Sequence, residues 1–160
     1  MVITAVVTVG LWLADRTAKS VPPSGTITSV QDNLVLTRDA LYVAGEASDI
    51  PAGSEVWIVV RAGVERLWYP VKAVNVASDG TWRSDEDPNN PQEVLVTTPG
   101  AYYIQIYCAD MGAIAALQKE KADSLASGIY DGMQRLPRGA RFLDEKPIRR
   151  TAPEAPAGDS

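Results

Sequence analysis

The side chains best suited to chemistry form an acidic and amide-rich run that starts at Asp85. Asp85 and Asp87 are paired carboxylates, and together with Glu86, Asn89 and Asn90 they offer the oxygen ligands that calcium prefers. Their spacing matches no EF-hand loop, and the Pro88 between them is typical of a solvated turn. An exposed loop also does not raise a carboxyl pKa, as an acid–base pair requires. The run therefore favours a solvated turn over a calcium site, and no metal or cofactor site is predicted.

Nucleophilic catalysis has little support in the sequence. The chain contains no His, so Cys108 and the serines lack the base that most often activates such groups. Cys108 ends an alternating apolar stretch, which predicts a buried small hydrophobe. One Cys can form neither an intrachain disulfide nor a Cys-rich zinc site. These observations predict a protein that is not an enzyme, with a small hydrolase as the least favoured alternative.

Aromatic side chains offer a different chemistry, which is stacking against a sugar ring or a partner. Alternation along two predicted strands places Trp57 on one side of the first strand, and Tyr103 and Tyr107 on one side of the second. If the strands are neighbours, these rings form one outward patch. The helix that follows the second strand, or Phe142 of the last strand, is favoured as its cover because the chain passes directly into that helix. If the patch stays open, Trp57, Tyr103 and Tyr107 are the candidate ligand or partner residues.

The elements that would position these residues are mostly strands. Short apolar runs separated by turn signals predict about seven strands between residues 25 and 108, as in an all-β sandwich. Asp79-Gly80 marks a tight turn, because Gly tolerates a positive φ. Trp68 and Tyr69 are expected to form a cross-strand cluster with Trp82.

One helix is predicted, before the last strand, at residues 110–127. This stretch is rich in Ala, Leu, Lys and Glu and contains no Pro, with Asp110 as N-cap and Gly128 as stop. The residues expected to face the sheet repeat at helical spacing: Met111, Ala115, Ala122 and Leu125. The last strand contains Pro147, which is best placed at a sheet edge.

The 160 residues, 46% of them hydrophobic, suffice for one domain with appendages. The predicted segments are an apolar, helical anchor or signal-like segment at 1–16, a linker at 17–24, a β-sandwich at 25–150 and a disordered tail at 151–160. The apolar segment is short for a membrane span of about 20 residues and fits a signal peptide. A third alternative is favoured, in which the natural chain starts upstream and the segment lies within a longer transmembrane helix. A strand of the domain at residues 2–13 is the remaining alternative.

Several motifs along residues 24–150 resemble a bacterial immunoglobulin-like accessory domain. They are Gly25-Thr26-Ile27, Gly45 to Ala47, Pro51-Ala52-Gly53, Val56-Trp57-Ile58-Val59-Val60-Arg61, Tyr69-Pro70, Asp79-Gly80-Thr81-Trp82, Pro99-Gly100-Ala101-Tyr102 and Pro137-Arg138-Gly139-Ala140. Similar domains occur in membrane-anchored or multidomain proteins of actinobacteria and cyanobacteria. The resemblance implies an immunoglobulin-like β-sandwich with one inserted helix, and it implies no catalytic residues.

Charge narrows the range of partners. The net charge is −5, and the 15 basic residues are scattered among 20 acidic ones, which argues against nucleic acid. The prediction is a non-catalytic interaction or spacer module, membrane-anchored or secreted, with a protein or a cell-envelope component as partner. The alternative is a carbohydrate- or cell-wall-binding module that uses the aromatic patch. The domain is placed outside the cytoplasm, although Arg16 and Lys19 after the apolar segment would favour a cytoplasmic position.

Overall fold

The computed structural model of the chain describes residues 21–37, 40–85 and 94–152. The apolar segment 1–16, most of the linker, the acidic run after Asp85 and the tail from residue 153 lie outside the described residues. Within the described ranges, no helix is long and apolar enough to cross a membrane.

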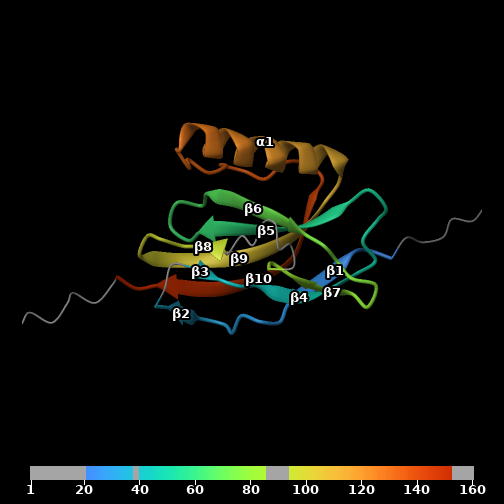
Figure 1. Cartoon of the computed structure of the whole chain (residues 1–160), viewed down its shortest axis with the longest axis horizontal. Coiled ribbons are helices and arrows are strands. Elements are labelled where there is room, and N and C mark those ends of the chain that lie inside the picture. The colour runs from blue at the N-terminus through green and yellow to red at the C-terminus, as the bar shows by residue number, and fades with distance from the viewer. Residues whose placement is uncertain (1–20, 38–39, 86–93, 153–160) are drawn as a thin grey trace, which may run out of the picture.

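The described residues form two main sheets and one helix, α1 (Met111–Ser127) (Figure 1). The small sheet has the strand order β1 (Ser24–Ile27), β4 (Ala44–Ser48) and β7 (Thr81–Arg83). The large sheet has the strand order β2 (Leu34–Leu36), β10 (Ala140–Arg150), β9 (Gly100–Ala109), β5 (Glu55–Ala62) and β6 (Trp68–Val74). A short third pair joins β3 (Ala40–Leu41) to β8 (Val94–Leu95). The prediction of a mostly β fold with one helix before the last strand is therefore confirmed.

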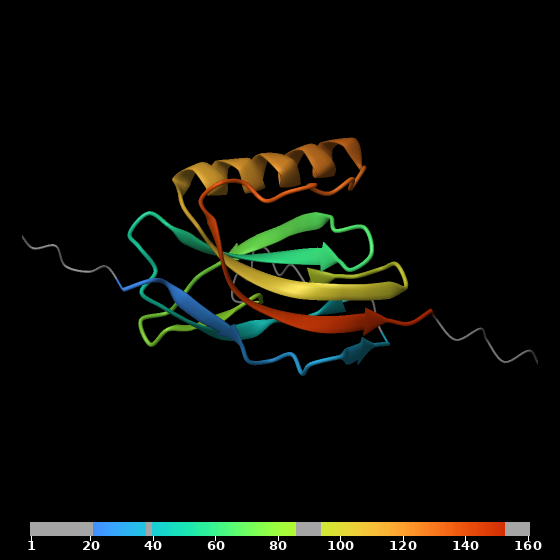
Figure 2. The ribbon, with the colours of Figure 1, turned by 180° about the vertical axis from the view of Figure 1, so that it is seen from behind.

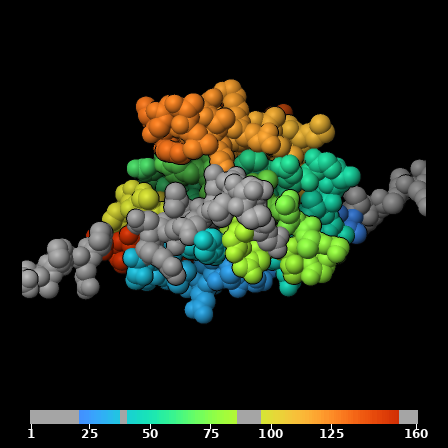
Figure 3. Space-filling model, viewed as in Figure 1, coloured from blue at the N-terminus to red at the C-terminus, as the bar shows by residue number. Residues whose placement is uncertain are grey.

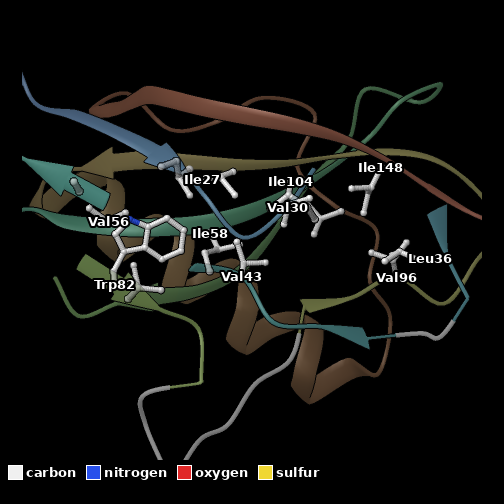
Figure 4. Packing of buried hydrophobic residues seen from close by; sticks show 14 residues of the cluster. Ile27, Val30, Leu36, Val43, Val56, Ile58, Trp82, Val96, Ile104 and Ile148 are labelled. Carbon is white, nitrogen blue, oxygen red and sulfur yellow. The ribbon is translucent and has the colours of Figure 1, made fainter. Parts of the chain in front are cut away.

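The core lies between the two main sheets. Alternation along β5 turns Val56, Ile58 and Val60 inward, where they belong to one cluster of buried residues with Ile104 of β9 (Figure 4). The small sheet contributes Trp82, which is fully buried. A Cβ at Gly45 on the neighbouring strand would lie 2.5 Å from a Trp82 ring carbon. Glycine at this position therefore leaves room for the indole.

The expected cluster of Trp68, Tyr69 and Trp82 is only partly formed. Tyr69 packs against the same buried cluster as Trp82. Trp68 directly precedes Tyr69 in β6, so its side chain points to the opposite face of the large sheet. There its indole N–H donates to the Gln105 side chain. The prediction was wrong for Trp68 because two adjacent residues of a strand cannot share one face.

Helix α1 begins and ends where its caps predict. The Asp110 carboxylate accepts a hydrogen bond from the Ala113 N–H at 2.9 Å, and Gly128 adopts the left-handed conformation with φ 68°. The predicted buried stripe is wrong, however, since Met111 and Leu125 are 76% and 57% exposed. The buried residues of α1 are Ala113, Leu117 and Ser124. Alanines occur around the whole helix, so the sequence offered two stripes of similar apolarity.

Replacing the N-cap tests how much this cap contributes. Asp110→Ala should lower the free energy of unfolding by about 0.5–2 kcal/mol, because the Ala113 N–H loses its acceptor. Urea unfolding measures the change. Asp131→Ala, at an exposed position after the helix, is the control and should stay within about 0.5 kcal/mol of the parent chain. Equal effects of the two substitutions would contradict the capping role.

Pro147 does not lie on an edge strand, contrary to the prediction. Strand β10 lies between β9 and β2. The Pro147 carbonyl accepts a hydrogen bond from the Asn33 N–H at 2.8 Å, so it points away from β9, and the proline nitrogen points the same way. Pairing with β2 starts only at Ile148. The ladder therefore does not need the N–H that proline lacks.

The described chain enters the two-sheet fold at one end and leaves it at the other. Figures 1 and 2 show the start of β1 and the end of β10 at opposite ends in both views. Strand β10 has 11 residues. At about 3.3 Å per residue it extends over roughly 36 Å. The points where the chain enters β1 and leaves β10 are therefore far apart.

Candidate functional site

The three aromatic residues of the predicted patch lie on one face of the large sheet. Strands β5 and β9 are antiparallel neighbours, with Trp57 opposite Tyr107 and Arg61 opposite Tyr103. Residues directly opposite each other in such a pair project from the same face. The register therefore brings the candidate rings together on the face opposite the core, as alternation predicts.

This face is closed over Trp57. The indole is 3% exposed and belongs to a second buried cluster with Ala113 and Leu117 of α1. Its N–H donates to the Glu55 carboxylate at 2.9 Å. All residues of β5 from Val56 to Val60 are buried, which requires cover on both faces of the strand. The expectation that the helix covers Trp57 is confirmed.

The two tyrosines have different surroundings. Tyr107 is 7% exposed, and its ring meets Phe142 edge-on at a centroid distance of 5.7 Å. Tyr103 is half-buried, with the Arg61 guanidinium 4.1 Å from its ring centroid. Two of the three rings are therefore inaccessible for stacking against a ligand, and Tyr103 already has a cation over its ring.

A polar network built on Gln105 joins these aromatic residues. The Gln105 side-chain oxygen accepts hydrogen bonds from the Trp68 N–H at 3.1 Å and from the Tyr107 hydroxyl at 2.9 Å. Its amide nitrogen donates to Glu145 at 2.8 Å. The Glu145 carboxylate oxygen Oε2 lies 3.9 Å from the Arg61 guanidinium nitrogen Nη2. Burial raises the pKa of Tyr107, so its hydroxyl stays protonated and can donate. The network satisfies buried groups, and a Gln inside an aromatic run was its only sequence signal.

Gln105→Ala should lower the free energy of unfolding by about 1–3 kcal/mol. The substitution leaves the Trp68 N–H and the Tyr107 hydroxyl without their acceptor in a place that water does not reach easily. Equilibrium unfolding in guanidinium measures the effect. Gln134→Ala is the matched control, because Gln134 is exposed. A Gln105→Ala variant as stable as the control would show that the network contributes nothing.

Asp85 and Cys108, which were considered as catalytic groups, both have structural roles in the described fold. Asp85 accepts two hydrogen bonds from Arg83, at 2.9 and 2.8 Å, and these bonds hold the pKa of its carboxyl below the usual value. Its predicted companions, which are Glu86, Asp87, Asn89 and Asn90, lie outside the described residues. Cys108 is 4% exposed, and burial raises the pKa of its thiol, which disfavours the thiolate. Within the described ranges, no three His, Cys, Asp or Glu residues are placed to hold a metal ion.

An open groove of about 940 Å³ lies at one end of the two-sheet fold. It is lined by the β5–β6 turn, the start of β9 and the end of α1. Large apolar side chains at its rim are exposed: Val64, Leu125 and Tyr130. In Figure 3 the helix and the residues after it form the upper edge of the molecule above β5 and β6. The sequence could not predict this groove because its walls are distant along the chain.

Comparison with known proteins leaves the family of this chain undetermined. No protein-family model matches the sequence, and no curated protein is significantly similar to it.

Proposed function

We propose that the chain is a non-catalytic interaction or spacer module of immunoglobulin-like fold. The observation that carries the proposal is the position of the two ends of the fold, which lie at opposite ends of the described domain. A domain connected in this way holds the segments before and after it apart.

Strand order supports the immunoglobulin-like part of the proposal. The order β1-β4-β7 corresponds to strands A, B and E of that fold, and β10-β9-β5-β6 corresponds to G, F, C and C′. In chain order, helix α1 follows strand F and precedes strand G. The added parallel strand β2 beside β10 extends the large sheet without changing this order.

The surroundings of the candidate site residues support a non-catalytic role. Trp57, Tyr107 and Gln105 are buried. The Trp57 indole N–H donates to the Glu55 carboxylate, and the Tyr107 hydroxyl donates to the Gln105 side-chain oxygen. The carbohydrate-binding alternative requires exposed rings and gains no support from this burial. The exposed apolar rim at Val64 and Tyr130 favours contact with a protein or cell-envelope partner in addition to spacing.

The proposal places the domain outside the cytoplasm, membrane-anchored or secreted, on the basis of the apolar segment 1–16. The test is protease treatment of intact bacterial cells that produce the full chain with an epitope after residue 160. An anchored chain should appear in the membrane fraction and lose its epitope, whereas a secreted chain should appear in the medium. A cytoplasmic marker protein must stay intact. A soluble chain whose epitope is protected until the cells are lysed would contradict the proposal.

A further inference from the structure

The chain contains two Asp-Gly pairs, and their surroundings in the fold differ. They are Asp79-Gly80, in the turn before β7, and Asp131-Gly132, in the segment between α1 and β10. An aspartate followed by glycine can react with the glycine nitrogen, because glycine has no Cβ to hinder the approach. The structure around each pair therefore decides which of them reacts.

Hydrogen bonds restrain both residues of the first pair. The Asp79 carboxylate oxygen Oδ1 accepts hydrogen bonds from the Thr81 N–H at 3.0 Å and from the Thr81 hydroxyl at 2.7 Å. The Gly80 N–H donates to the Ala77 carbonyl at 2.9 Å. These bonds hold the carboxylate toward Thr81 and keep the proton on the Gly80 nitrogen, which is the atom that would have to attack.

The second pair has none of these restraints. Asp131 is exposed, and neither its carboxylate nor the Gly132 N–H makes a hydrogen bond within the described part of the chain. Gly132 lies outside any helix or strand, with φ 72°. A Cβ at Gly132 would lie 2.8 Å from a carbon of the Tyr69 ring. Packing therefore requires the least hindered residue at the position of the attacking nitrogen.

We propose that Asp131-Gly132 is a site of spontaneous isoaspartate formation in the folded protein, whereas Asp79-Gly80 is protected. The Gly132 nitrogen loses its proton to solvent and attacks Cγ of Asp131. A new N–C bond forms, the bond from Cγ to the departing water oxygen breaks, and a succinimide ring results. A second water molecule then opens the ring, so that one water leaves, one enters and nothing is oxidised or reduced.

The ring can open at either of its two carbonyls. Opening at the side-chain carbonyl restores aspartate. Opening at the main-chain carbonyl gives isoaspartate, in which the main chain runs through Cβ and Cγ of residue 131. This product has one more carbon–carbon bond in the main chain, a length of about 1.5 Å.

The added length falls next to a contact at the outer edge of the large sheet. Met133 exchanges two backbone hydrogen bonds with Trp68 of β6, at 2.8 and 3.0 Å. The Trp68 indole also donates to Gln105, so a displacement at this bridge reaches the polar network of the aromatic face. The modification site goes beyond the module role proposed above and does not depend on it.

The test is incubation of the full chain in water enriched in ¹⁸O, at neutral pH and physiological temperature. Each succinimide that hydrolyses gains one ¹⁸O atom, so peptide mapping by mass spectrometry measures the reaction at each pair. Electron-transfer fragmentation separates isoaspartate from aspartate. We expect ¹⁸O and isoaspartate to accumulate faster at residue 131 than at residue 79, and the Trp68 and Met133 amide protons of the isomerised chain to exchange faster with solvent. Equal rates at the two residues, or no incorporation at residue 131, would overturn the proposal.

The same incubation in concentrated guanidinium separates the effect of the fold from that of the local sequence. The two pairs should react at similar rates in the unfolded chain. A preference for residue 131 that persists after unfolding would mean that the neighbouring residues in the sequence decide the rate, and it would also overturn the proposal.

Two variants, each shown by a thermal melt to be folded, complete the experiment. Asp131→Glu keeps the exposed charge but requires a larger ring, so it should abolish incorporation at residue 131 and leave Asp79 unchanged. Thr81→Val removes one hydrogen bond from the Asp79 carboxylate and should increase incorporation at residue 79. An unchanged rate at Asp79 in the Thr81→Val variant would contradict the protection that the hydroxyl is proposed to give.

Discussion

Trp57→Ala should lower the free energy of unfolding by about 3–5 kcal/mol, the range for truncating a core aromatic side chain. The indole is 3% exposed between β5 and α1, where it packs with Ala113 and Leu117. Removing it leaves a cavity that two regular elements, a strand and a helix, can collapse into only partly. The hydrogen bond to Glu55 is lost as well.

Equilibrium unfolding in urea, followed by circular dichroism, measures this effect. Tyr130→Ala is the control, because Tyr130 is an aromatic residue that is 59% exposed, and it should change stability by less than about 0.5 kcal/mol. If Trp57→Ala were as mild as the control, the ring would not be a core residue. An open stacking surface would then have to be reconsidered.

The elements of the fold were largely predictable from local signals. The helix was expected at residues 110–127 and is observed at Met111–Ser127, because a capping Asp, an αL Gly and a proline-free stretch between them act locally. Alternation in β5 placed Trp57 opposite the core face, and the turn at Asp79-Gly80 forms with φ 90° at Gly80. These features depend on neighbouring residues, so a single sequence carries them.

Features that depend on pairing between distant segments were not predictable. Gln105 could be placed on the outer face of its strand, but its partners lie 37 and 40 residues away, at Trp68 and Glu145. A pocket between α1 and β6 is lined by residues of both elements, which come together only after α1 folds back over the sheet. Pro147 was assigned to an edge because the sequence does not show that β2 pairs alongside β10.

The buried side of α1 was assigned wrongly for the same reason, because it depends on a surface formed by segments distant along the chain. An Ala-rich helix presents small apolar residues on several sides, so the side that faces the sheet is decided by its fit to the partner surface. The partner surface here is the Trp57 indole together with Ala73 of β6. Ala113 next to the indole permits close approach, and Leu117 fills the space beyond it. The larger residues Met111 and Leu125 are left exposed.

Two leucines on this helix therefore provide the sharpest test of its register. Leu117→Ala should lower the free energy of unfolding by about 2–5 kcal/mol, since Leu117 is fully buried against Trp57. Leu125→Ala is the matched control, with the same substitution on the same helix at a side chain that is 57% exposed, and should cost less than about 0.5 kcal/mol.

The Leu117 side chain and the Trp57 ring belong to one buried cluster, so the effects of truncating them should not be additive. In a double-mutant cycle, Leu117→Ala and Trp57→Ala should show a coupling free energy of about 0.5–3 kcal/mol, whereas Leu125→Ala and Trp57→Ala should add within about 0.5 kcal/mol. Urea unfolding of the single and double variants measures both cycles. A larger cost at Leu125 than at Leu117 would mean that α1 is rotated about its axis relative to the sheet. The stripe of Met111 and Leu125 would then face Trp57, and the helix would cover the aromatic face through different side chains.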